Sequence, residues 1–93
     1  MEVHKIMCAC GNGIGSSLMV EMNINSVLNT LGRTDIEVTH TTISEVKPGV
    51  ADLYVFGRDL ANFVDGIEED RLVVLNNIID KNELTEKLGA KLG

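Results

Sequence analysis

The fold is decided at one junction, Cys10-Gly11-Asn12-Gly13-Ile14-Gly15-Ser16-Ser17, where an apolar run meets a helical pattern. Residues 5–9, before the junction, are predicted to form a buried β-strand. Residues 16–31, after it, carry apolar side chains at the spacing of one helical face, namely Val20, Ile24, Val27, Leu28 and Leu31. The glycines let the connecting backbone take conformations that other residues avoid. The sequence therefore predicts a strand, a glycine-rich turn and a helix in succession.

The rest of the chain continues this alternation of strands and helices. Further strands are predicted at residues 36–41, 53–56 and 71–75, a helical turn before Pro48, a short helix at 60–64 and a final helix at 80–92. Gly32 is placed to end the first long helix and Asp80 to cap the last one. This order is typical of an α/β fold, here a three-layer sandwich with a four-stranded parallel sheet, strand order 2-1-3-4, and helices on both faces. We expect residues 1–93 to form one domain.

Strand order also predicts where a ligand would bind. In a doubly wound sheet, ligands bind beyond the carboxyl ends of the strands, at the point where the strand order reverses. The glycine-rich turn would lie there, together with Gly57-Arg58-Asp59 and the residues after Leu75. Arg58 could bring a positive charge to this edge or remain a solvated surface residue.

Composition excludes several classes of function. The net charge of −6 and the aromatic content of 3% argue against nucleic-acid binding, which needs a basic face and stacking side chains. No apolar stretch is long enough to span a membrane, and the N-terminus lacks the features of a secretory signal, so a cytoplasmic location is expected. Cys8 and Cys10, with His4 and His40 as the only histidines, make a poor zinc set. We expect no metal and no organic cofactor.

The candidate nucleophile is Cys10. The first N–H groups of a helix have no partners within the helix, and the helix dipole adds positive charge there, so an oxyanion fits such a place. The same field favours a cysteine thiolate. Cys8, inside the strand, is expected to be a small core residue, and His4 and His40 to be surface or strand histidines.

Motif spacing separates the possible phosphate sites. The nucleotide-binding loop needs a lysine after its glycines, and no lysine lies between Lys5 and Lys47. The dinucleotide pattern fails because Ser16 stands at its third glycine. A cysteine phosphatase loop needs an arginine where the chain again has Ser16, and a hydroxyl cannot replace the two-point grip of a guanidinium on phosphate. A small phosphatase, an arsenate-reductase-like enzyme and a thiol redox module remain as alternatives to a phosphoryl carrier.

The stretch from Ala9 to Ser17, directly after the first strand, resembles the IIB components of the bacterial phosphoenolpyruvate-dependent sugar phosphotransferase system. The resemblance is nearest to the ascorbate type, within a group that includes lactose, galactitol and mannitol types. It implies that Cys10 accepts a phosphoryl group from a phosphohistidine on a IIA protein and passes it to a sugar during uptake by the membrane IIC permease. It also implies a monomer associated peripherally with that permease. The sugar could be ascorbate, galactitol or another.

On this interpretation the phosphoryl group is held by a cradle of backbone N–H groups and nearby side chains, formed by Gly11, Asn12, Gly13, Ile14, Gly15, Ser16 and Ser17. Ser16 and Ser17 could also cap the helix, and Asn12 could serve only the turn. Ile14 could cover the thiol or touch a partner. Met19 and Met22 are predicted to be packing residues. A carrier must nonetheless leave the apolar residues nearest Cys10 partly exposed, because two proteins have to reach its sulfur.

Overall fold

The computed structural model describes residues 3–10, 14–58, 60, 64, 66–78 and 80–92. Strands and helices alternate along this part of the chain, as predicted. In order they are β1 (Lys5–Cys10), α1 (Ile14–Thr30), β2 (Glu37–Thr42), the 3₁₀ helix η1 (Ile43–Glu45), β3 (Leu53–Gly57), the 3₁₀ helix η3 (Glu69–Arg71), β4 (Leu72–Leu75) and α2 (Lys81–Leu92).

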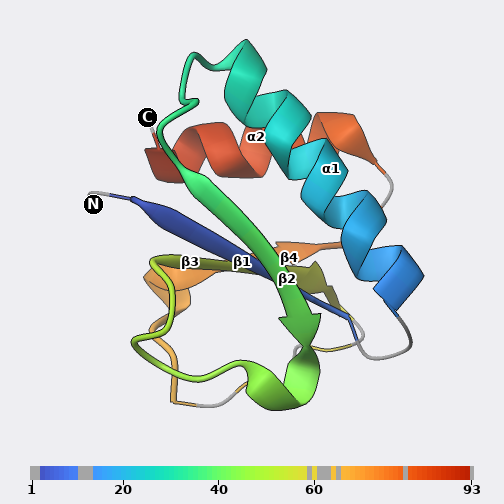
Figure 1. The fold of residues 1–93 in the computed structure, drawn as a ribbon, viewed down its shortest axis with the longest axis vertical. Coiled ribbons are helices and arrows are strands. Elements are labelled where there is room, and N and C mark those ends of the chain that lie inside the picture. Colours follow the sequence, from blue (N-terminus) through green and yellow to red (C-terminus); the bar gives the residue numbers. More distant parts are fainter. Residues whose placement is uncertain are drawn as a thin grey trace.

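The four strands form one parallel sheet in the order β2-β1-β3-β4, which confirms the predicted topology (Figure 1). β1 lies inside the sheet, where Cys8 is level with His40 on one side and with Val55 on the other. β3 is buried along its whole length, as expected for a strand whose two faces are both covered. The carboxyl ends of all four strands therefore share one edge.

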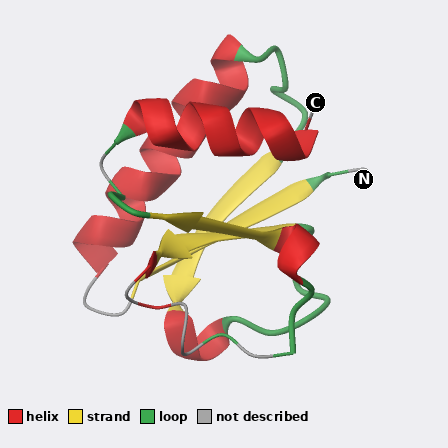
Figure 2. Cartoon of the chain, turned by 180° about the vertical axis from the view of Figure 1, so that it is seen from behind, coloured by secondary structure: helices red, strands yellow, loops and turns green. Residues whose placement is uncertain are grey.

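Helices α1 and α2 cover the same face of the sheet and pack against each other (Figures 1 and 2). Their buried side chains join those of the strands in one core, which includes Val20, Ile24, Val27, Leu28, Leu84 and Leu88. α1 has 17 residues and α2 has 12. Among the described residues, no helix combines the length and apolar character that crossing a membrane requires.

The second face of the sheet is covered by irregular chain and 3₁₀ turns, among them η1 (Figure 2). Tyr54 and Phe56 are the large buried side chains of its core. The Tyr54 hydroxyl accepts the N–H groups of Val50 and Ala51, at 3.2 and 3.0 Å, and donates to the carbonyl of Lys47. The predicted sandwich is thus present with α-helices on one face and 3₁₀ helices on the other. Most of the helix expected at residues 60–64 lies outside the described residues.

Both predicted helix ends are confirmed. After α1, Gly32 has φ +75°, its N–H donates to Asn29 and the N–H of Arg33 donates to Leu28, at 3.2 and 2.8 Å. This pair of bonds is the Schellman motif, in which glycine takes the left-handed conformation at low cost. Before α2, Oδ1 of Asp80 accepts the N–H groups of Asn82 and Glu83, at 3.0 and 3.2 Å.

Candidate functional site

Cys10 is the last residue of β1, and α1 begins at Ile14, so only three residues join the strand to the helix. Thr42, the last residue of β2, lies level with Cys10. The side chain of Cys10 and the residues Gly11, Asn12 and Gly13 lie outside what the structure describes. The backbone nevertheless places the candidate nucleophile at the carboxyl edge of an inner strand, which is where parallel sheets bind ligands.

Other candidate segments meet at the same edge. β3 ends at Gly57, which is followed by the exposed Arg58, and β4 ends at Leu75, which is followed by Asn76. Gly57 and Leu75 lie level with each other. The predicted convergence is therefore confirmed for these segments, while Asp59 lies outside the described residues.

The amino end of α1 follows Cys10 directly. In any α-helix the first four N–H groups have no acceptor within the helix, and in α1 these groups belong to residues 14–17. The sequence of this turn contains no acidic residue, so no carboxylate of its own competes for the positive end of the dipole. Ser16 and Ser17 are the third and fourth residues of α1. α1 thus begins two residues before the start predicted at Ser16, and the side chains of both serines lie outside what the structure describes.

Cys8 is a core residue, as predicted. Its side chain is completely buried, and its Sγ donates to the carbonyl oxygen of Thr39 on the neighbouring strand, at 3.3 Å. A thiol held in this way has no route to an incoming protein. Cys8 therefore provides a matched control for any experiment on Cys10.

A pair that sequence reasoning missed connects β2 to α1. Nδ1 of His40 lies 2.6 Å from Oε2 of Glu21. Because an ionised carboxylate can only accept, the imidazole donates from Nδ1. The two residues are 19 positions apart and meet only because the chain crosses over between β1 and β2. No local spacing in the sequence signals this contact.

The first half of α1 carries an exposed apolar patch. Leu18, Met19 and Met22 are 44%, 49% and 65% exposed. The prediction that the two methionines are packing residues was wrong, because Val20, Ile24 and Val27 fix which side of the helix faces the core. The expectation that apolar residues near Cys10 stay partly exposed is confirmed for these three side chains.

The connection after β4 is held by one carboxylate. Glu83 accepts the N–H groups of Asn76 and Asn77, at 2.8 and 3.0 Å, and the ammonium of Lys87, at 2.7 Å. The hydrogen bond from Asn76, followed by those from Lys87 and Asn77, lowers the pKa of Glu83 to about 2. Lys87 also donates to the carbonyl of Val74. These bonds tie the beginning of this connection to α2.

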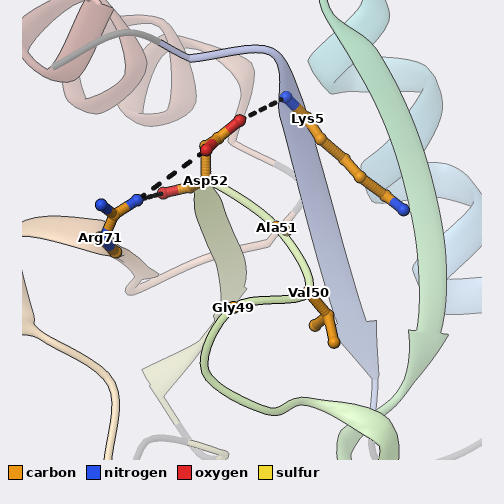
Figure 3. Close-up of a pocket in the computed structure, with 6 residues that line it drawn as sticks. All are labelled: Lys5, Gly49, Val50, Ala51, Asp52 and Arg71. Atoms are coloured by element: carbon orange, nitrogen blue, oxygen red, sulfur yellow. Dashed lines mark hydrogen bonds and ion pairs between the residues drawn. The ribbon is translucent and has the colours of Figure 1, made fainter.

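A hollow of about 430 Å³ lies at the amino ends of β1 and β3, away from Cys10 (Figure 3). Oδ2 of Asp52 accepts the N–H groups of His4 and Lys5, at 2.8 and 3.0 Å, and the bond from His4 is the main reason why the pKa of Asp52 is lowered. Arg71 donates to the carbonyl of Asp52 at 3.2 Å. These bonds join the starts of the strands, and we interpret them as structural. Within the described ranges, no three His, Cys, Asp or Glu side chains gather as metal ligands would.

The fold places the candidate cysteine at the end of β1, so the candidate functional edge of this α/β protein lies at the carboxyl ends of its strands. A family model described as "PTS system, Lactose/Cellobiose specific IIB subunit" matches residues 5–90. The chain therefore belongs to the IIB family of the phosphotransferase system, which confirms the resemblance seen in the sequence.

Two kinds of relative accompany this match. An ascorbate-specific PTS system EIIB component from Mycoplasma pneumoniae is 25% identical over 88 residues, covering 94% of this chain and 93% of the relative. The mannitol-specific EIICBA components of Klebsiella pneumoniae and Escherichia coli K12 are each 33% identical over 93 residues, covering 96% of this chain. The match spans only 14% of those two longer proteins.

Membership of the family establishes the general role. IIB components are phosphocarriers in sugar uptake and take part in sugar phosphotransfer. They work with IIA and IIC partners.

Proposed function

We propose that Cys10 is the phosphoryl carrier of this IIB protein. Its thiolate attacks the phosphorus of a phosphohistidine on a IIA protein in line with the leaving nitrogen. The S–P bond forms as the N–P bond breaks, and the electron pair of the broken bond returns to the imidazole. A sugar hydroxyl then attacks the phosphorus of the phosphocysteine as the S–P bond breaks. The electron pair of that bond returns to sulfur as the thiolate, and the hydroxyl proton passes to solvent.

The observation that carries the proposal is the position of Cys10. It ends an inner parallel strand only four positions before α1 begins, at an edge where the connections after β3 and β4 also start. A phosphoryl group here lies close to the positive end of a helix dipole. Phosphoryl transfer depends mainly on such positioning and on donors to the phosphoryl oxygens.

The cradle we propose consists of backbone N–H groups following Cys10, with the serine hydroxyls as further donors. It is formed by Gly11, Asn12, Gly13, Ile14, Gly15, Ser16 and Ser17. No residue of this set is an arginine. A cradle without the guanidinium fork of a cysteine phosphatase suits a protein that holds its phosphoryl group until an acceptor arrives.

We propose ascorbate as the sugar and a single IIB domain as the organisation of residues 1–93. The support is the ascorbate-specific relative, which matches along nearly its whole length. On this proposal the protein acts as a monomer on the cytoplasmic side of a IIC permease, which holds the sugar. Vesicles containing an ascorbate-type IIC should then accumulate ascorbate phosphate, and those with a galactitol-type IIC should accumulate no phosphorylated galactitol.

The proposal is tested by intact-mass analysis after incubation with phosphoenolpyruvate, the general phosphotransferase proteins and a IIA phosphodonor. We expect one added phosphoryl group on the wild type and on Cys8→Ser, and none on Cys10→Ser. Cys8→Ser is the matched control because it changes the other thiol of the same strand. An adduct that survives in Cys10→Ser would overturn the assignment, and steady hydrolysis of an aryl phosphate without an adduct would indicate a phosphatase.

A further inference from the structure

We infer that the outward face of the first half of α1, formed by Leu18, Met19 and Met22, is the surface on which the IIA phosphodonor docks. The inference rests on the proposed function, because it assumes that a protein delivers a phosphoryl group to Cys10. It names a specific contact surface and assigns it to the IIA protein, one of the two expected partners, the other being the IIC permease.

This face of α1 has the residue composition that is typical of the central region of a protein interface. Three large apolar side chains, each more than two-fifths exposed, lie together on neighbouring turns of the helix. Protein interfaces are distinguished by a central region that lacks charge and is enriched in residues such as methionine. α1 contains a single charged residue, Glu21, although 24% of the whole chain is charged.

The position of the face links it to phosphoryl transfer. Leu18 is the fifth residue of α1, and α1 begins four positions after Cys10. The apolar side chains occupy the half of the helix nearer Cys10, while Asn25 and Asn29 continue the same outward stripe in the other half. A protein that brings a group to Cys10 from the side of α1 meets the apolar half first.

Charge favours the phosphodonor as the occupant. A phosphohistidine is strongly anionic, and this chain has a net charge of −6, so an approach over surface carboxylates would be repelled. The one carboxylate of α1 accepts a hydrogen bond from His40 at 2.6 Å and its side chain is only 18% exposed. On α1 itself, therefore, an anionic donor meets no fully exposed acidic side chain.

The experiment measures the initial rate of Cys10 phosphorylation against the concentration of phosphorylated IIA protein. Met22→Glu places a charge at the most exposed of the three positions and should raise the half-saturating donor concentration about tenfold, as loss of a central interface contact does. At saturating donor the end point should remain one phosphoryl group per chain. Met22→Lys should raise the half-saturating concentration less, because it adds no repulsion toward the phosphoryl group.

Asn29→Glu is the matched control. It adds the same side chain to the same stripe of α1, about 10 Å further along the helix axis. Its half-saturating concentration should stay within about twofold of wild type, because this half of the helix lies outside the proposed surface. An equal effect of both glutamates would show that only overall charge matters and would overturn the inference.

The outcomes also separate this inference from the proposed function. A wild-type chain that takes up no phosphoryl group at any donor concentration would remove the proposed function and the docking surface with it. Normal loading of Met22→Glu at every donor concentration would overturn the docking surface alone. Normal loading combined with slow delivery to the sugar in IIC-containing vesicles would also overturn it, and would assign the face to the permease.

Discussion

Helices α1 and α2 cover the same face of the sheet but present opposite chemistry on their outward sides. α2 has charged residues along its twelve positions, namely Lys81, Glu83, Glu86, Lys87 and Lys91. α1 is longer, contains only Glu21 as a charged residue and exposes Leu18, Met19 and Met22. Burial constrains only the inward stripe of each helix, so the outward stripe is free to serve another purpose. The helix that follows Cys10 is the one whose outward stripe is apolar in its first half.

The largest effects should come from the inward stripes, where the two helices are alike. Ile24 of α1 and Leu88 of α2 are both fully buried. Ile24→Ala and Leu88→Ala should each lower the free energy of unfolding by about 2–5 kcal/mol, because each leaves a cavity in the same core. Urea denaturation followed by circular dichroism measures both.

Met22→Ala applies the same measurement to an outward position of α1, for comparison with Ile24→Ala. Its side chain is 65% exposed, so we expect a change within about 0.5 kcal/mol. A loss as large as that of Ile24→Ala would mean that Met22 packs inward, and the contrast between the two helices would then be lost.

A second test concerns the charged side of α2. The folded state holds the pKa of Glu83 at about 2, below its usual value of 4.5. Since the folded pKa is the lower one, the ionised carboxylate stabilises the fold above pH 4.5, and this contribution is lost as the pH falls toward about 2. Glu83→Gln should therefore be less stable than wild type at neutral pH, and the difference should shrink across this acid range.

The measurement is the urea midpoint of both proteins across that pH range. Glu86→Gln, which removes an exposed carboxylate from the same helix, is the control for the loss of a negative charge. A difference between Glu83→Gln and wild type that stays constant down to pH 2 would show that the carboxylate charge of Glu83 does not stabilise the connection after β4.

The strand order and the helix ends were predictable because local residues encode them. Gly32 ends α1 through its left-handed conformation, and Asp80 caps α2 through its carboxylate. Each signal lies within a few positions of the structure that it produces. The alternation of strands and helices then restricts the sheet to very few orders, because parallel crossovers share one hand.

Features that depend on distant parts of the chain were not predictable in the same way. The Glu21–His40 pair requires the crossover between β1 and β2. The segment that covers the second face of the sheet is held by hydrogen bonds between the Tyr54 hydroxyl and backbone groups of the connection before β3. The prediction that Met22 is a packing residue failed for a different reason. The helical phase set by Val20, Ile24 and Val27 already places Met22 outward. The prediction relied on the apolar character of methionine and not on its position in the helix. The role of Cys10 remains a prediction from its sequence context.

Effects smaller than those of the buried Ile24 and Leu88 should come from one glycine in each helix segment. Gly32, which follows α1, has φ +75°, where a side chain is strained, so Gly32→Ala should lower the free energy of unfolding by about 1–2 kcal/mol. Gly89 lies inside α2, and a Cβ added there would meet no atom within 4 Å. Gly89→Ala should raise that free energy by about 0.5–1 kcal/mol, because alanine favours the helix and loses less entropy on folding.

The two glycine variants have opposite expected signs, so a single series of urea denaturations compares them directly. An alanine that destabilises both positions equally would contradict the assignment of Gly89 to a regular helix interior with open space beside it. The sign of the change in the free energy of unfolding at Gly89 also distinguishes α2 from α1. If Gly89→Ala raises the free energy of unfolding, the flexible backbone at Gly89 limits the stability of α2. The stability of α1, in contrast, depends on the left-handed glycine that ends it.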